Sequence, residues 1–197
     1  MCSKNKHNRA MKRLRGELET GGASEKMAEE WFDVVDEGDR VIGQAPRSRV
    51  HAERLLHRAV HIFVFNSGGE FLLHLRSATK DEYPLTYTSS ASGHLAVDEE
   101  YDAAAARELQ EELGLSGTLT RLHKLTASPE TAYEHTVLYR IVTDRQPSPD
   151  PEEIAEVRFV AWEEVISLLR ENPQKFSPPF RLLVEWYDRN RDNFPGE

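Results

Sequence analysis

Short apolar runs separated by turn residues recur along the chain and predict β-strands. Residues 32–36 and 40–44 flank Glu37-Gly38-Asp39 and predict a hairpin. Residues 61–65 and 70–76 flank Asn66-Ser67-Gly68-Gly69, a strong signal for a second hairpin. Further strands are predicted at residues 118–127, 135–143 and 156–161.

Residues 101–113 have the clearest helical pattern. The 3.6-residue period is followed by Ala103, Ala106, Leu109, Gln110 and Leu113, as on the apolar face of a helix, and Gly114 suits the position that ends one. Helices are also predicted at residues 162–171 and 178–190, with a short helix or irregular crossing at 47–56. Residues 79–92 and 144–153 are polar and contain proline, so we predict loops there.

These elements mix without regular strand–helix–strand alternation. We therefore predict an α/β fold of the α+β type, in which a mixed β-sheet lies between helices and an N-terminal β-hairpin precedes it. Residues 29–197 are predicted to form one domain, and residues 1–28 a disordered tail, because that segment is polar and glycine-containing. Met27 lies just before the first predicted strand and is a second candidate for the start of translation.

Charge narrows the range of partners. The formal net charge is −9, and the first sixteen residues carry +6, which leaves −15 for the rest. An acidic body repels duplex nucleic acid, and a phosphorylated substrate would need a local source of cations.

No apolar run is long enough to span a membrane, and Cys2 is the only cysteine, so we expect a cytoplasmic protein without an intramolecular disulfide. The sequence leaves a homodimer open.

Three carboxylates share one face of the predicted helix at 101–113. Glu108, Glu111 and Glu112 lie at positions i, i+3 and i+4, where like charges repel. A solvated acidic surface would explain the pattern, because such helix faces are common. A hard divalent cation such as Mg²⁺ or Mn²⁺ would instead make the cluster favourable.

The surroundings of this cluster favour the metal interpretation. Residues 93–115 match G-x5-E-x7-R-E-U-x-E-E-x-G-U, where U is aliphatic, at every specified position. This segment resembles the Nudix box, a highly specific motif of diphosphate-cleaving enzymes. The resemblance implies that Glu108, Glu111 and Glu112 bind the metal, with the Gly93 carbonyl as a further ligand. It also implies that Arg107 pairs with Glu99 and orients the motif.

A looser resemblance, to the isopentenyl diphosphate isomerase branch of the same superfamily, covers about residues 30–185. It rests on Leu56-His57-Arg58-Ala59, the turn at Asn66–Gly69, Arg76-Ser77-Ala78-Thr79-Lys80, Tyr83-Pro84, Ser92-Gly93-His94 and Phe176-Ser177-Pro178. The resemblance implies that Arg76 and Lys80 bind the diphosphate; alternatively, they are solvated loop residues.

The same resemblance places several histidines. His57 and His94 match positions that bind the isomerase metal, whereas His51 lies one residue out of register with another ligand. A lone histidine is more often a packed or exposed residue than a ligand. The sequence assigns no role to His61, His74, His123 or His135.

Two positions bear on the choice of reaction. Ser92 aligns with the catalytic cysteine of the isomerases, and a serine hydroxyl is a poor acid–base group. Glu134 aligns with an essential isomerase glutamate, and we expect it, or Glu111, to take the proton from water. We therefore predict a metal-dependent Nudix pyrophosphohydrolase acting on a nucleoside diphosphate derivative or similar small-molecule diphosphate, with Glu111, Glu112, Arg107 and Glu134 as its catalytic residues.

Two alternatives remain at this point. One is an isomerase-like enzyme, and the other is a catalytically silent Nudix-fold binding module, although such modules commonly lack box glutamates. Tyr83 and Tyr87 occupy a loop that flanks the predicted site, where they either stack on a substrate ring or pack against the protein.

Overall fold

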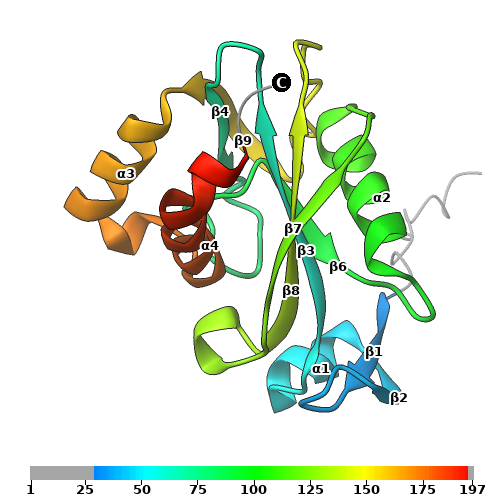
Figure 1. The fold of residues 1–197 in the computed structure, drawn as a ribbon. Coiled ribbons are helices and arrows are strands. Elements are labelled where there is room, and N and C mark those ends of the chain that lie inside the picture. Colours follow the sequence, from blue (N-terminus) through cyan, green and yellow to red (C-terminus); the bar gives the residue numbers. More distant parts are fainter. Residues whose placement is uncertain (1–28, 195–197) are drawn as a thin grey trace, which may run out of the picture.

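The computed structural model describes residues 29–194, in which a mixed sheet lies between two helical layers (Figure 1). The strands are β1 (Trp31–Val35), β2 (Val41–Pro46), β3 (His57–Phe65), β4 (Phe71–Arg76), β5 (Tyr87–Thr88), β6 (Ala91–His94), β7 (Thr120–Leu125), β8 (Glu134–Val142) and β9 (Ile154–Val160). The helices are α1 (Arg47–Glu53), α2 (Tyr101–Leu113), α3 (Trp162–Glu171) and α4 (Pro178–Asn190), with single 3₁₀ turns at Pro129–Thr131, Pro173–Lys175 and Arg191–Asn193.

Strand β3 lies at the centre of the seven-stranded sheet. It runs parallel to β8 over nine residue pairs, from His57–Glu134 to Phe65–Val142. Its other edge pairs antiparallel with β6 and, at one position, with β4. The remaining strands extend the sheet, β5 and β9 along β4, and β7 along β8. Nearly every β3 residue is buried, which suits a strand covered on both faces.

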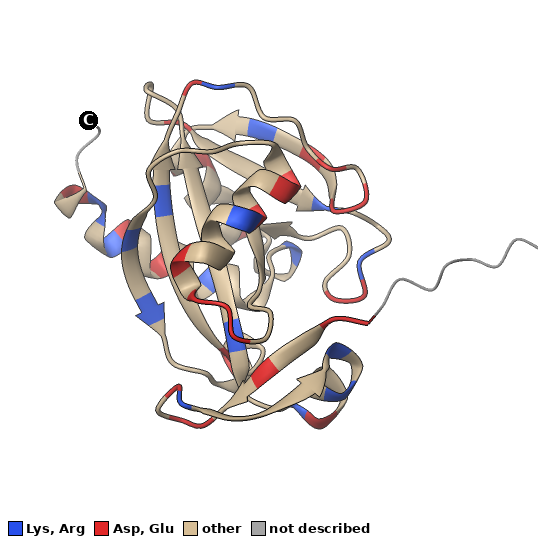
Figure 2. Cartoon of the chain, turned by 90° about the vertical axis from the view of Figure 1, so that its right-hand side faces the viewer, with Lys and Arg blue, Asp and Glu red and all other residues tan. Residues whose placement is uncertain are grey.

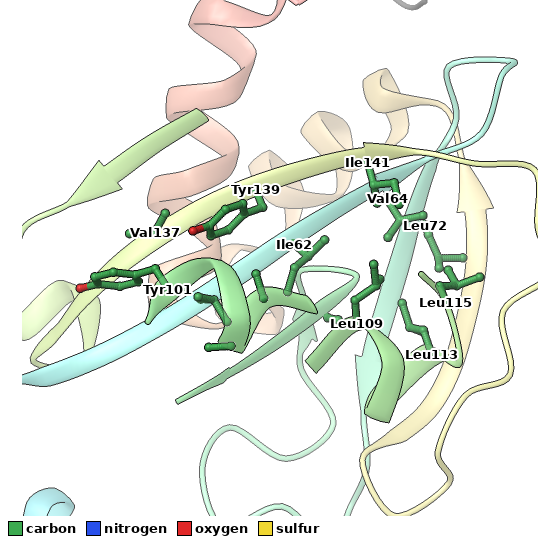
Figure 3. Packing of buried hydrophobic residues seen from close by; sticks show 14 of the residues in the cluster. Ile62, Val64, Leu72, Tyr101, Leu109, Leu113, Leu115, Val137, Tyr139 and Ile141 are labelled. Carbon is green, nitrogen blue, oxygen red and sulfur yellow. The ribbon is translucent and has the colours of Figure 1, made fainter. Parts of the chain in front are cut away.

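The two faces of β3 supply two separate cores. Ile62 and Val64 point toward α2, where they pack with Leu109, Leu113 and other buried residues (Figure 3). Phe63 and Phe65 belong to an aromatic cluster under α3 and α4 that includes Phe71, Trp162, Phe180 and Tyr187. The predicted sheet between helices is therefore confirmed.

The predicted N-terminal hairpin is also present and is anchored at its turn. Strands β1 and β2 pair antiparallel as a separate sheet, and Phe32, Ala45 and Val50 form a small core beneath it. The carboxylate of Asp39 accepts hydrogen bonds from Arg58, Lys124 and Tyr101, which lie on β3, β7 and α2. This network joins the hairpin to the rest of the domain.

Most strand bounds differ from the prediction by one or two residues, and three segments differ more. Strand β3 begins at His57, four residues before the predicted start, because the polar His57 and Arg58 obscured the strand pattern. Helix α1 ends at Glu53, followed by the left-handed Arg54, rather than extending to residue 56. The segment predicted as a loop at 79–92 contains β5 and the first half of β6. Serine and glycine have low strand propensity there, but pairing with β3 and β4 overrides it.

The predicted face of α2 is also corrected. Ala103, Ala106 and Gln110 are exposed, whereas Ala104 and Ala105 are completely buried. Positions 103–106 are all alanine, so their identity does not indicate which face of the helix is buried. The 3.6-residue period alone therefore selected Ala103 and Ala106 instead of Ala104 and Ala105. Leu109 and Leu113 are buried as predicted.

In the part of the chain that the structure describes, no helix has the length and apolarity needed to cross a membrane. The predicted tail at 1–28 and the alternative start at Met27 lie outside the described residues.

Candidate functional site

Helix α2 presents its three carboxylates in different environments. Glu112 faces the sheet and is buried, Glu108 is 12% exposed, and Glu111 is 59% exposed. The backbone N–H of Ser92 on β6 donates to Glu112 Oε2 at 3.2 Å. The three glutamates predicted as metal ligands therefore all lie where α2 meets β6, and all line one cavity.

Burial makes two of these carboxylates difficult to ionise. It raises the pKa of Glu108 to about 7, although Arg107 acts in the opposite direction. Burial and the nearby Glu108 and Glu153 raise the pKa of Glu112. Crowded, poorly hydrated carboxylate oxygens are the donor set that a hard divalent cation prefers. The residues present therefore fit Mg²⁺ or Mn²⁺.

Arg107 holds the carboxylates in place. Its Nε and Nη2 donate to Glu99 at 2.8 Å each, and its Nη1 donates to Glu108 at 2.7 Å and to Glu111 at 3.0 Å. Nη2 also donates to the carbonyl of His94 at 3.0 Å. The expected pairing of Arg107 with Glu99 is present, and the same guanidinium ties α2 to β6.

Gly93 leaves room for the Glu108 side chain. A Cβ atom at position 93 would lie 2.0 Å from Glu108 Oε1, a distance that would force the carboxylate away. Glycine at this position therefore allows Glu108 to keep its place against β6. The role of the Gly93 carbonyl as a metal ligand stays a prediction.

A second candidate centre, the histidine cluster, consists of His51, His57 and His94, with Glu134 beside it. One ring nitrogen of each histidine lies within 4.8 Å of the others. Glu134 Oε1 is 3.0 Å from His94 Nε2 and 3.8 Å from His57 Nε2. Phe32 covers the group, with its ring centroid 4.8 Å from that of His94 and 5.9 Å from that of His57.

The hydrogen bonds of this cluster suit metal binding. His57 Nδ1 is 2.9 Å from the carbonyl of Leu55, which only accepts, so Nδ1 carries the proton. His51 Nδ1 is 3.0 Å from Glu82 Oε1. Both Nε2 atoms are buried without a hydrogen-bond partner among the described residues. Imidazoles oriented in this way by an oxygen on Nδ1 are typical of metal ligands.

The protonation states agree with this geometry. Burial lowers the pKa of His57 to about 4 and that of His94 to about 3, so both rings are neutral at pH 7. Burial also raises the pKa of Glu134 to about 7. The fit to a cation that accepts imidazole is therefore good.

The sequence alone did not place His51 in the histidine cluster. The resemblance left it one residue out of register with an isomerase ligand, but α1 and the left-handed turn at Arg54 bring its ring to those of His57 and His94. The signal in the sequence was the pair His51 and His57 on either side of a helix end.

Both centres border one cavity of about 580 Å³. His94 and Glu134 line it on one side and the box glutamates on the other. The histidine cluster and the box glutamates lie on opposite faces of the sheet, because side chains alternate along β6. Gly93 faces α2, whereas Ser92 and His94 face away from it, and the cavity extends around this edge strand. Glu134 therefore lies beside the histidine cluster, across the cavity from the box glutamates.

The predicted cationic residues differ in their surroundings. Arg76 lines the cavity and uses Nε to donate to the carbonyl of Glu82 at 3.1 Å. Lys80 also lines it, but its Nζ pairs with Glu153 Oε2 at 2.5 Å. Glu153 and Asp150 reach the cavity from the loop before β9, and sequence analysis did not identify either of them. Figure 2 shows that acidic residues are frequent on α2 and on the loops beside it.

The two loop tyrosines have different surroundings. Tyr83 lines the cavity and is 37% exposed, so it is available to a substrate ring. Tyr87 packs against Phe176 with a centroid distance of 5.4 Å. Ser92 also lines the cavity, and it is the cross-strand neighbour of His61 in the pairing of β6 with β3.

Comparisons with known proteins agree with this architecture. The NUDIX domain family model matches residues 55–183. An isopentenyl-diphosphate Delta-isomerase from Nocardia farcinica is 34% identical over 165 residues, which cover 79% of this chain and 93% of that protein. An uncharacterised Nudix hydrolase from Yersinia pestis is 33% identical over 170 residues, which cover 85% of this chain and 91% of that protein.

Solved structures share the fold. A Deinococcus radiodurans protein superposes with a TM-score of 0.72 at 25% identity, covering 79% of this chain and 98% of that one. A MutT protein from Methanosarcina mazei gives a TM-score of 0.59 at 20% identity, covering 71% and 96%. The match to the family model over most of the chain, with the relatives above 30% identity, shows that the chain belongs to the Nudix family.

Proposed function

We propose that the protein is a metal-dependent pyrophosphohydrolase acting on a small organic diphosphate, such as a nucleoside diphosphate derivative. The observation that carries the proposal is the complete set of box carboxylates, Glu108, Glu111 and Glu112, at a cavity that also contains Arg76. A Nudix family member with all of these groups has what diphosphate cleavage requires.

Each residue has a distinct task in this proposal. Glu108, Glu111 and Glu112 hold a divalent cation, and Arg107 fixes their orientation. That cation, when bound, neutralises phosphate oxygens and makes water a better nucleophile at neutral pH. Arg76 places a guanidinium on the diphosphate, whose oxygens match its paired donors. Lys80 also binds the diphosphate once a phosphate oxygen replaces Glu153 as the partner of its ammonium group.

The reaction transfers a phosphoryl group to water. An oxygen of water bonds to phosphorus, the bridging P–O bond breaks, and a carboxylate accepts the proton. Glu111 suits this role because it is the most exposed of the three glutamates and meets solvent in the cavity. Glu134, our other candidate, accepts it only if the substrate brings water toward the histidine cluster.

A second candidate function is isomerisation of an isopentenyl-type diphosphate. The histidine cluster with Glu134 favours it, as do relatives named isopentenyl-diphosphate isomerases. Ser92 opposes it, because a hydroxyl is too weak an acid to replace a thiol in proton transfer at carbon. A binding module without turnover is the third candidate, and the intact box opposes it.

The decisive experiment supplies candidate substrates to the purified protein with and without Mg²⁺ or Mn²⁺. The set covers nucleotide sugars, dinucleoside polyphosphates, NADH, coenzyme A, dNTPs and isopentenyl diphosphate, with products identified by mass spectrometry. We expect metal-dependent cleavage of one diphosphate class. Isomerisation without phosphate release would support the second candidate, and tight binding without turnover the third.

Glu112→Gln provides the matched variant for this screen. We expect it to lower kcat by several orders of magnitude, because a cation ligand is lost. The fold should persist, since a neutral amide replaces a carboxylate that burial already disfavours in its charged form. Unchanged turnover in Glu112→Gln would remove this residue from the reaction.

A further inference from the structure

Glu82 connects the two halves of the site through two different groups. It lies on the loop between β4 and β5 and lines the main cavity. Its side-chain Oε1 is 3.0 Å from His51 Nδ1, and its backbone carbonyl accepts from Arg76 Nε at 3.1 Å. One residue therefore contacts both the histidine cluster and the cation that faces the diphosphate.

The side-chain contact sets the tautomer of His51. With its Nδ1 proton directed at a carboxylate, the ring keeps a free lone pair on Nε2. That atom is buried without a hydrogen-bond partner, and the ring centroid lies 5.3 Å from that of His57 and 5.2 Å from that of His94. Among the described residues, Glu82 is the only recorded side-chain partner of His51 apart from ring contacts. Loss of its carboxylate would free the imidazole to rotate or change tautomer.

The backbone contact sets the direction of Arg76. Its bond to Glu82 is the one side-chain hydrogen bond recorded for Arg76 within residues 29–194. Because Nε is occupied, the two terminal nitrogens stay available for phosphate oxygens. The next residue, Tyr83, has a φ of 48°, which is unfavourable for a tyrosine, so contacts around it hold the loop in this conformation.

We propose that Glu82 is a positioning residue that couples cation binding at the histidine cluster to diphosphate binding at Arg76. Fixing His51 fixes the loop at residue 82, and that in turn fixes Arg76; each ligand therefore strengthens the binding of the other. The diphosphate half of this inference rests on the proposed function, whereas the histidine half stands on the cluster alone.

Metal affinity tests the histidine half without any turnover. Metal-stripped protein is titrated with Co²⁺ in excess Mg²⁺, which fills the carboxylate site, and the visible absorption of imidazole-bound Co²⁺ is followed. We expect Glu82→Ala to weaken Co²⁺ binding about 10- to 100-fold, the usual effect of losing an outer partner of a ligand histidine. Glu82→Gln should recover most of the affinity, because its amide oxygen accepts the same hydrogen bond.

Two further variants make the result specific. Asp81→Ala removes the same charge from the neighbouring exposed position, where no side-chain contact is recorded, and should leave the affinity unchanged. Glu82→Asp keeps the charge but shortens its reach, so it should weaken binding to an intermediate degree. Circular dichroism confirms the fold of each variant. Equal Co²⁺ affinity in wild type and Glu82→Ala, or equal losses in Asp81→Ala and Glu82→Ala, would overturn the proposal.

Linkage tests the coupling. The Co²⁺ titration is repeated with methylenediphosphonate, a diphosphate that resists hydrolysis. We expect the wild type to bind Co²⁺ at least about fivefold more tightly in its presence, and Glu82→Ala to show a ratio near one. A ratio near one in the wild type would overturn the coupling. Cleavage activity is scored separately, so hydrolysis with no Glu82 effect refutes this inference alone, and coupling with no hydrolysis refutes the proposed function alone.

Discussion

At the scale of single residues, the site depends on how closely two backbones approach. Gly93 on β6 lies against the Glu108 carboxylate, and Ser92 uses its backbone N–H, not its hydroxyl, to hold Glu112. Both contacts place α2 carboxylates on the cavity wall. The backbone of β6 is therefore as important for the carboxylate centre as its side chains are for the histidine cluster.

We predict that Gly93→Ala lowers kcat at least about 100-fold, because the added Cβ displaces Glu108 by more than an ångström. Stability should change little, since the displaced group is the end of a side chain. Gly43→Ala is the matched control, with no atom within 4 Å of its added Cβ. Steady-state kinetics and urea unfolding measure the two effects, and normal turnover in Gly93→Ala would contradict the assigned position of Glu108.

Ser92→Ala separates the two candidate reactions. A hydrolase uses the backbone of Ser92, so we expect kcat for diphosphate cleavage to remain near the wild-type value. The measurement is kcat on the substrate found in the screen. A large loss would instead indicate that the hydroxyl takes part in proton transfer, as the isomerase-like alternative requires.

At the scale of elements, helix α2 serves both the core and the site. Ala104, Ala105, Leu109 and Leu113 pack against the sheet, and Glu112 is buried beside them at the edge of the cavity. Small alanines allow the helix to approach β3 and β6 closely. Gly114, with a φ of 63°, ends the helix directly after these residues.

Two leucine substitutions test this face assignment. Ala104→Leu should lower the free energy of unfolding by about 1–3 kcal/mol, because the buried position has no room for three more carbons. Ala103→Leu should change it by less than about 0.5 kcal/mol, since that position is exposed. Urea unfolding of both variants gives the comparison, and equal effects would mean that the face is wrong.

The sequence predicted the elements whose information is local. The box is contiguous, so its resemblance to the family motif was enough to place Glu108, Glu111, Glu112 and the Arg107–Glu99 pair. Helices α2, α3 and α4 were predicted with their observed bounds. Strand β6 and the roles of His51, Glu82 and Glu153 depend on contacts between distant segments, and no local pattern reports those.

At the scale of the whole molecule, the pairing of β3 with β6 and β8 brings together site residues that are far apart in sequence. It places His94 and Glu134 next to His57. The N-terminal hairpin then closes over the histidine cluster with Phe32, and Asp39 secures it. The hairpin therefore supplies part of the wall of the candidate site.

The Asp39 network should make stability depend on pH. Burial alone would raise the pKa of Asp39, but hydrogen bonds from Lys124, Arg58 and Tyr101 outweigh it and hold the pKa below 3.8. The depressed pKa means that Asp39 stabilises the fold above about pH 4, and that this contribution is lost as the pH falls below 3.8. Asp39→Asn should cost about 1–3 kcal/mol at pH 7 and progressively less in acid.

Urea unfolding across this pH range measures the difference between wild type and variant. Glu37→Gln, on the same turn and without a recorded side-chain contact in the described chain, is the control and should match the wild type throughout. A cost of Asp39→Asn that does not change with pH would show that packing, not charge, is responsible.

The alternation of side chains along β6 has a consequence for how this protein can change over time. Substitutions within the strand alter one centre and leave the other, so the two can diverge independently. An insertion or deletion of one residue behaves differently, because it turns Gly93 and His94 to each other's faces and disables both centres together. Among homologues that keep both the box glutamates and the histidine cluster, the length of this strand should therefore be more strictly preserved than the identity of most of its residues.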